Sequence, residues 1–313
     1  MNIKKALPFL ILLVWTLFSC SPKGYDFRFF SIGDMPYHLP DDLGRFDRVI
    51  SSLNHERPAF TVHVGDFKTG SSPCDEDYFL SIRDYFQQFQ HPLFYTPGDN
   101  EWTDCHRVAA GGYDPIERLA KVRELFYTDT GSLSGSGMDL ITQSTFAEYG
   151  KFVENRLWKH KGITFGTLHI VGSNNNFKTD SAANNVEYNE RDKANSFWLE
   201  EIFRQAKASK SDGVVIFLHA GLVYSDDESN GFKNFVMKLR EEAMAFEKPI
   251  LMVYGDHHKF KIEKPLTAGD GKVLTNFTSL MVFGDHDMHA VEIRVNKKYD
   301  ALFEIRQYFV KGN

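Results

Sequence analysis

FFSIGD at residues 29–34, TVHVGD at 61–66 and FYTPGD at 94–99 are three apolar, strand-like stretches that each end in Gly-Asp. The Gly-Asp pairs lie 32 and 33 residues apart, about the length of a strand-helix-strand unit. We therefore expect Asp34, Asp66 and Asp99 to meet at the carboxyl ends of neighbouring parallel strands. Ionised carboxylates this close repel one another and are costly to bury unpaired. A bound cation removes that cost, so the pattern predicts a metal-dependent enzyme.

The rest of the chain also alternates strand-like and helical segments. Asp114-Pro115 is typical of a helix start, because Asp caps the helix and Pro suits its first turn. Residues 128–137 are polar and Gly-rich, which predicts an exposed loop. The apolar runs at 273–283, 290–295 and 301–309 are predicted to form a β meander. With no long linker in the sequence, we predict one α/β domain over residues 27–313, with two packed sheets flanked by helices.

The N-terminus is typical of an export signal. Lys4 and Lys5 precede an apolar run over residues 6–18, which is shorter than the roughly 20 residues that a membrane span needs. Leu-Phe-Ser before Cys20 resembles the lipobox of bacterial lipoproteins. We therefore expect residues 1–19 to be a signal peptide and residues 20–26 a tether lipidated at Cys20. The protein would then be anchored to a bacterial membrane on its periplasmic or cell-surface side. An uncleaved anchor and a soluble secreted protein are the alternatives.

The net charge bears on the class of binding partner, and the cysteine content bears on disulfide formation. The net charge is −6, and removing residues 1–19, with two lysines and no acidic residue, makes it −8. An acidic domain is a poor match for nucleic acid, whose binding depends on Lys and Arg. We expect a monomer. Export favours a disulfide between Cys74 and Cys105; two free thiols or a pair of metal ligands are the alternatives.

Further polar residues follow strand-like runs in the second half of the chain. Carboxylate, imidazole and amide groups are ligands for divalent metals, and the set is too large for one ion. Two ions about 3.5–4 Å apart, bridged by a carboxylate, would use it fully. In chain order the set is Asp34, Asp66, Asp99-Asn100-Glu101, His219 and Asp256-His257-His258.

This order resembles that of the calcineurin-like metallophosphoesterases, which carry an Asp, Gly-Asp, Gly-Asn-His-Asp/Glu, a lone His and Gly-His-x-His. The resemblance covers residues 27–283 and implies a four-layer αββα sandwich with a dinuclear centre. It implies that Asp34 and His258 bind the first metal and that Asp66 bridges both. Asp99 stands where the family has an Asn ligand, His219 would bind the second metal, and Asp256 stands at the first His of the last motif.

Two positions differ from the family pattern. The first motif usually reads Asp-x-His, but Pro36 stands at the place of that His, so Tyr37 or His38 would substitute. Asn100 occupies the place of the family's catalytic His and would orient a phosphate oxygen. We expect His106, or alternatively His257, to donate a proton to the leaving group.

The sequence thus predicts a phosphoric-ester hydrolase that uses two divalent ions (Mn, Fe, Zn or Mg) and an activated bridging water. The alternative is a non-catalytic lipoprotein that keeps the fold and binds a metal or ligand. A nucleotide-binding protein is disfavoured, because no Gly-rich loop follows the first strand. We interpret Gly284-Asp285-His286-Asp287, which imitates the site motif, as a hairpin turn.

Overall fold

The computed structural model describes residues 24–127, 132–135, 138–180, 185–298 and 301–313. The predicted signal peptide, Cys20, most of the tether and most of the predicted 128–137 loop lie outside these ranges, so those expectations stay predictions. Within the described ranges, the helices are too short or too polar to cross a membrane.

Two mixed sheets form the centre of the molecule. The first has the strand order β12-β11-β1-β2-β3 and the second β4-β5-β6-β7-β8-β10-β9. The first sheet consists of β1 (Phe27–Ile32), β2 (Thr61–His63), β3 (Leu93–Tyr95), β11 (Ala290–Val295) and β12 (Phe303–Tyr308). The second consists of β4 (Leu140–Thr142), β5 (Arg156–His160), β6 (Ile163–Thr167), β7 (Gly213–Phe217), β8 (Ile250–Tyr254), β9 (Lys261–Glu263) and β10 (Phe277–Met281).

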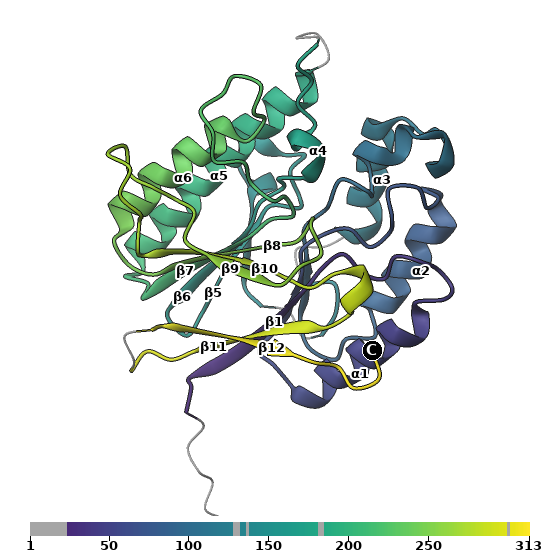
Figure 1. The fold of residues 1–313 in the computed structure, drawn as a ribbon, viewed down its shortest axis with the longest axis horizontal. Helices are drawn as coiled ribbons and strands as arrows, with labels where there is room; N and C mark the ends of the chain where they lie inside the picture. The colour runs from purple at the N-terminus through teal and green to yellow at the C-terminus, as the bar shows by residue number, and fades with distance from the viewer. Residues whose placement is uncertain (1–23, 128–131, 136–137, 181–184, 299–300) are drawn as a thin grey trace, which may run out of the picture.

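Helices cover the outer face of each sheet (Figure 1). The first sheet packs against α1 (Leu43–Glu56), α2 (Glu76–Phe86) and α3 (Pro115–Phe126), and the second against α5 (Val186–Ala208) and α6 (Lys233–Phe246). The predicted cap of α3 is confirmed, since Asp114 accepts hydrogen bonds from the backbone N–H groups of Ile116 and Glu117. The four-layer αββα architecture is confirmed as well.

Side-chain alternation along β1 explains how the layers join. Phe30 and Ile32 point into the core beneath the helices, whereas Phe29 points toward the other sheet. Between the sheets Phe29 meets Phe165 and Phe217 of the second sheet edge to face, with ring centroids 5.5 and 6.0 Å apart. These aromatic contacts bury large apolar surfaces and hold the two sheets together.

The predicted C-terminal meander is confirmed for its last two strands and wrong for its first. β10 pairs in parallel with β8 in the second sheet, whereas β11 and β12 pair antiparallel in the first sheet. The segment between β10 and β11 therefore crosses from one sheet to the other. Gly284-Asp285-His286-Asp287 lies on this crossover and includes a short 3₁₀ turn (Asp285–Asp287), so its interpretation as a hairpin turn is also wrong.

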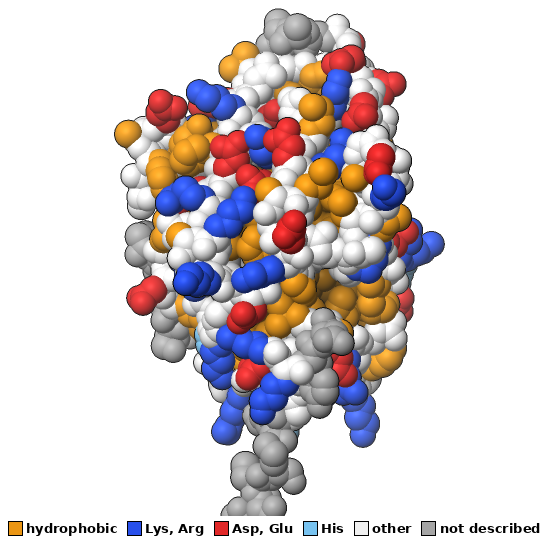
Figure 2. Space-filling model, turned by 90° about the vertical axis from the view of Figure 1, so that its left-hand side faces the viewer, with side chains coloured by type: hydrophobic (Ala, Val, Ile, Leu, Met, Phe, Trp, Pro, Cys, Tyr) orange, Lys and Arg blue, Asp and Glu red, His pale blue; other side chains and the backbone are white. Residues whose placement is uncertain are grey.

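The face shown in Figure 2 mixes acidic and basic side chains with scattered apolar ones. Ion pairs join the helices on the outside of the second sheet, as between Lys207 of α5 and Glu242 of α6 at 2.9 Å. Exposed pairs of this kind contribute about 0–1 kcal/mol each, so the buried cores dominate the stability of the fold.

Candidate metal centre

The first three predicted aspartates lie at one edge of the first sheet. Asp34, Asp66 and Asp99 follow β1, β2 and β3, which are adjacent and parallel. The pairings Ile32 to His63 and His63 to Tyr95 set the strand ends level. Three carboxylates are thereby delivered to the same place, as the even spacing predicts.

The other predicted ligands follow strands of the second sheet and lie close to the three aspartates. His219 follows β7, and Asp256 and His258 follow β8, its neighbour in the sheet. Asp256 donates its backbone N–H to Oδ1 of Asp34 at 3.0 Å, which ties the two sheets together at the site. The candidate centre therefore lies where the carboxyl ends of β1, β2 and β3 in the first sheet meet those of β7 and β8 in the second.

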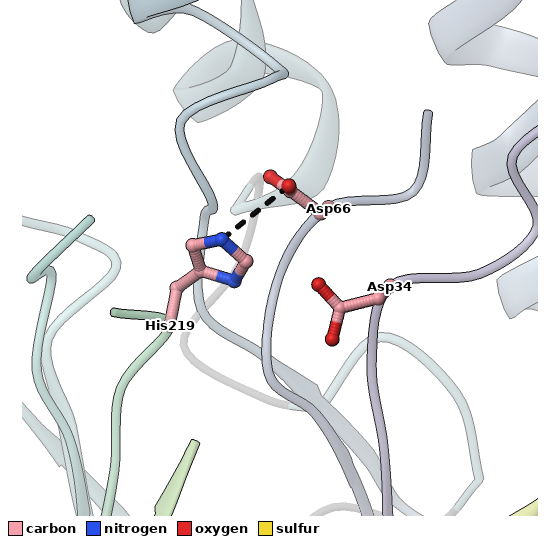
Figure 3. Close-up of side chains that lie close together, drawn as sticks. All are labelled: Asp34, Asp66 and His219. Carbon is pink, nitrogen blue, oxygen red and sulfur yellow. Dashed lines mark ion pairs between the residues drawn. The ribbon is translucent and has the colours of Figure 1, made fainter. Parts of the chain in front are cut away.

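The side chains form two groups, and within each group the ligand atoms lie within 4.8 Å of one another. The first group is Asp34, Asp66 and His219, and the second is Asp99, His219 and Asp256. Figure 3 shows the first group, with three side chains directed toward a common point. Nε2 of His219 lies 3.4 Å from Oδ2 of Asp66 and 3.2 Å from Oδ1 of Asp99. His219 belongs to both groups and lies between them.

Tyr37 lies in the site, in contact with Asp66 and His258. Its hydroxyl lies 3.1 Å from Oδ2 of Asp66 and 2.9 Å from Nε2 of His258. His38, the other candidate, is largely exposed and lies 3.7 Å from Asp285. Of the two residues considered as substitutes, the structure places Tyr37 in the site.

Asn100 contacts the carboxylate predicted to bridge the metals. Its Nδ2 donates to Oδ2 of Asp66 at 2.6 Å and to the carbonyl of Lys68 at 3.0 Å. Its backbone N–H donates to Oδ1 of Asp66 at 3.1 Å. These contacts orient Asp66, so they give Asn100 a positioning role; contact with a phosphate oxygen stays a prediction.

The predicted proton donors lie at the margin of the site. His106 is exposed, and its Nδ1 lies 2.6 Å from the carbonyl oxygen of Thr103. His257 is exposed as well, with Nε2 4.0 Å from Oδ2 of Asp256. The catalytic role of either residue stays a prediction.

A disulfide joins Cys74 and Cys105, as predicted. It connects the loops that follow Asp66 and Asp99, and both sulfur atoms lie 3.7 Å from the carbonyl oxygen of Asn100. The ammonium of Lys68, whose side chain is buried, donates to the same carbonyl at 2.8 Å. The cross-link and this hydrogen bond hold the Asn100 backbone beside the site.

Burial shapes the electrostatics of the centre. It raises the pKa of Asp34 to about 7 and that of Asp66 to about 6, against the attraction of His219. Burial also opposes ionisation of Asp99, but the His219 imidazole and the Ser173 hydroxyl outweigh it and lower the pKa of Asp99. Burial disfavours protonation of His219, yet Asp66 and Asp99 raise its pKa well above the usual value. The site thus holds negative charge at a cost in free energy.

The backbone of the site is unusual. Asp34, Asp66, Asp256 and His258 have φ of 54°, 56°, 79° and 59°, in the left-handed region that non-glycine residues seldom adopt. Such conformations cluster at functional sites and cost about 1–3 kcal/mol each. Gly98 allows the close approach of neighbouring loops, since a Cβ there would lie 2.0 Å from Oδ1 of Asp66.

The donor set fits a metal centre. Oδ2 of Asp34 and Nε2 of His219 are buried and have no hydrogen-bond partner among the described residues. Buried polar atoms normally have a hydrogen-bond partner, and a carboxylate oxygen and an imidazole nitrogen that lack one are suited to bind a cation. Carboxylate and imidazole ligands together match Mn, Fe and Zn, and carboxylates alone match Mg.

Comparison with known proteins agrees with this geometry. Residues 27–260 match the family model of the calcineurin-like phosphoesterases. The chain belongs to the calcineurin-like phosphoesterase family. Curated protein sequences gave no match.

Solved structures share the fold at low identity. A dimetal phosphatase from Danio rerio is 12% identical, with a TM-score of 0.50; the match covers 91% of this chain and 99% of that one. A purple acid phosphatase from yellow lupin (Lupinus luteus) seeds is 13% identical, with a TM-score of 0.50; the match covers 90% of this chain and 51% of the other. At these identities the likeness extends to the fold alone.

One residue of the site was missed by sequence reasoning. Ser173 follows the strand-like run that ends at Val171, and its hydroxyl donates to Oδ2 of Asp99 at 2.7 Å. The available signal was its position, since Gly172-Ser173 resembles the Gly-Asp pairs: a glycine and a short polar residue at the end of an apolar run.

Proposed function

We propose that the protein is a metal-dependent phosphoric-ester hydrolase with a dinuclear centre. One observation carries the proposal: two groups of ligand atoms meet at His219, and Oδ2 of Asp34 is a buried carboxylate oxygen that has no hydrogen-bond partner among the described residues. Membership of the calcineurin-like phosphoesterase family supports a phosphate ester as the substrate.

The first ion would be held by Asp34 and His258, with Asp66 shared, and the second by Asp99, His219 and Asp256. Two divalent ions supply polarisation of the phosphoryl group and a water of lowered pKa. The hydroxyl of Tyr37 contacts Asp66 and His258, two residues that we propose as ligands of the first ion. Tyr37 would serve there as an additional oxygen ligand.

The protein's own groups prepare the site for this chemistry. Asn100 orients Asp66 through its side chain and its backbone N–H. The N–H of Gly221 donates to Oδ2 of Asp256 at 2.9 Å, which fixes that carboxylate. Ligands held in place before substrate binds reduce the reorganisation that the reaction requires.

Turnover of chromogenic esters tests the proposal. The metal-free protein would be assayed with p-nitrophenyl phosphate and bis(p-nitrophenyl) phosphate after addition of Mn, Fe, Zn or Mg. We expect turnover that depends on metal and is lost in Asp66→Ala. Asp270→Ala is the matched control, because Asp270 is an exposed loop residue, and it should keep full activity.

The second candidate function is a non-catalytic protein that binds a metal or ligand through the same fold. Pro36 and Asn100 favour it, because they replace histidines of the family pattern. If the wild-type protein binds the added metal but turns over neither ester, the result would support this function and contradict hydrolysis.

We also propose that the protein is exported and anchored by a lipid on Cys20. The charged start, the short apolar run and the lipobox-like sequence support this. Cys20→Ala should prevent lipidation. The variant should then either appear in the soluble fraction or accumulate as an uncleaved precursor. Unchanged, carbonate-resistant membrane association of processed Cys20→Ala protein would contradict lipid anchoring.

A further inference from the structure

The segment that follows β6 has a rare backbone conformation. Ser173, Asn174, Asn175 and Asn176 have φ of 51°, 56°, 56° and 58°, so four consecutive non-glycine residues are left-handed. Three of them lie in the short element labelled α4 (Gly172–Asn175). Left-handed backbone disfavours L-residues by about 1–2 kcal/mol each. Contacts elsewhere must therefore hold this turn.

The contacts come from α5 and from the segment before α6. Nη1 and Nη2 of Arg191, which is buried, donate to Oδ1 and the carbonyl oxygen of Asn175 at 2.5 and 2.8 Å. Nδ2 of Asn175 donates to the carbonyl of Gly231 at 3.1 Å, and the N–H of Gly231 donates to Oδ1 of Asn174 at 2.8 Å. The turn is fixed from both sides.

The fixed turn presents two features to the metal centre. Ser173 donates its hydroxyl to Oδ2 of Asp99 at 2.7 Å. A Cβ on Gly172 would lie 2.8 Å from Oδ1 of Asp99 and 2.9 Å from Oδ1 of Asp256, so only glycine permits this approach. Both contacts involve carboxylates of the second ligand group.

The hydrogen bond from Ser173 determines which oxygen of Asp99 faces the centre. With Oδ2 held by Ser173, Oδ1 lies 3.2 Å from Nε2 of His219. An aspartate has no N–H to donate and rotates between two equivalent oxygens. The Ser173 hydroxyl makes those oxygens unequal and leaves Oδ1 available as a ligand.

We propose that Ser173 is a positioning residue for the second metal ion, acting through Asp99. This inference rests on one part of the proposed function, the binding of two metal ions. It does not require that the protein hydrolyses an ester. Groups that hydrogen-bond to metal ligands affect metal affinity by about 10–100-fold. Loss of the hydroxyl should weaken the second ion selectively.

Calorimetric titration of the metal-free, full-length protein with Mn²⁺, with bound metal counted by mass spectrometry, tests this. Wild type should bind two ions. Ser173→Ala and Ser173→Gly should each weaken the second ion by about 10–100-fold and leave the first unchanged. Glycine adopts φ of 51° freely, so backbone strain cannot explain a loss shared by the alanine and glycine variants.

A double-mutant cycle separates positioning from a general structural effect. Asp99→Ala removes the carboxylate through which Ser173 is proposed to act, so adding Ser173→Ala to it should change the residual second affinity by less than about twofold. Wild-type affinity for both ions in Ser173→Ala overturns the proposal, as does an equal loss with and without Asp99→Ala. Two ions bound without ester turnover would refute hydrolysis and leave the role of Ser173 intact.

Discussion

Replacing Asp34 with asparagine tests the cost of the unpaired carboxylate. Asp34 is fully buried, and burial raises its pKa from 3.8 to about 7. The folded, metal-free protein therefore binds more protons than the unfolded chain between these pH values, and its stability falls as the pH rises through this window. Asparagine cannot ionise, so Asp34→Asn removes this part of the pH dependence.

The magnitude follows from the shift. Each pKa unit corresponds to about 1.4 kcal/mol, so the raised pKa of Asp34 destabilises the metal-free fold by roughly 4 kcal/mol at pH 8, where Asp34 is ionised, and by about 2 kcal/mol at pH 5, where it takes up a proton on folding. The new amide N–H would occupy the position of Oδ2, which has no partner among the described residues. That costs about 1–3 kcal/mol at either pH. The difference between the two pH values is therefore the informative quantity.

Urea unfolding in EDTA at pH 5 and pH 8 measures this difference. We expect the stability of Asp34→Asn relative to wild type to rise by roughly 2–3 kcal/mol between pH 5 and pH 8. Adding Mn²⁺ at pH 8 should stabilise wild type more than the variant, because Asp34 is a proposed ligand of the first ion only. A relative stability that does not change with pH would refute the argument that Asp34 is held ionised at a cost.

Three further predictions address the surroundings of the site. Gly98→Ala places a Cβ 2.0 Å from Oδ1 of Asp66 and should abolish metal binding, as counted by mass spectrometry. Gly150→Ala is the control: a Cβ there meets no atom within 4 Å, so this variant should bind metal normally. Arg123→Ala leaves the buried carboxylate of Glu154 without its bidentate partner and should cost about 3–5 kcal/mol in urea unfolding; a loss below 1 kcal/mol would contradict this. Reducing the disulfide, which closes a loop with a sequence separation of 31, should lower the unfolding free energy by about 3–4 kcal/mol, and identical melting curves with and without reductant would argue against it.

The positions of the aspartates were predictable because they depend on local order. Strand length, the following glycine and the spacing between units place Asp34, Asp66 and Asp99 at one edge of a parallel sheet, and the structure has them there. The sheet to which β10 belongs was not predictable in this way. Apolar alternation shows that a strand forms, but its neighbours are chosen by long-range packing, and β10 pairs with β8 rather than β11.

Contacts between distant loops were also beyond the sequence pattern. Tyr37 and His38 are adjacent, and only the folded loop shows that the tyrosine enters the site while the histidine stays exposed. Ser173 and Asp99 are 74 residues apart, and a serine in a polar turn is ordinary by itself. The short strand β5 was missed because polar residues stand at both of its ends.

In the proposed centre, Asp66 lies between two metal ions. A crystal structure of the Mn²⁺-loaded protein with anomalous scattering measured at the manganese edge tests it most directly. We predict two anomalous peaks about 3.5–4 Å apart, one beside Asp34 and His258 and one beside His219 and Asp99, with the carboxylate of Asp66 contacting both. A fully loaded crystal with one peak, or with no peak at these residues, would show that Asp66 does not bridge two ions.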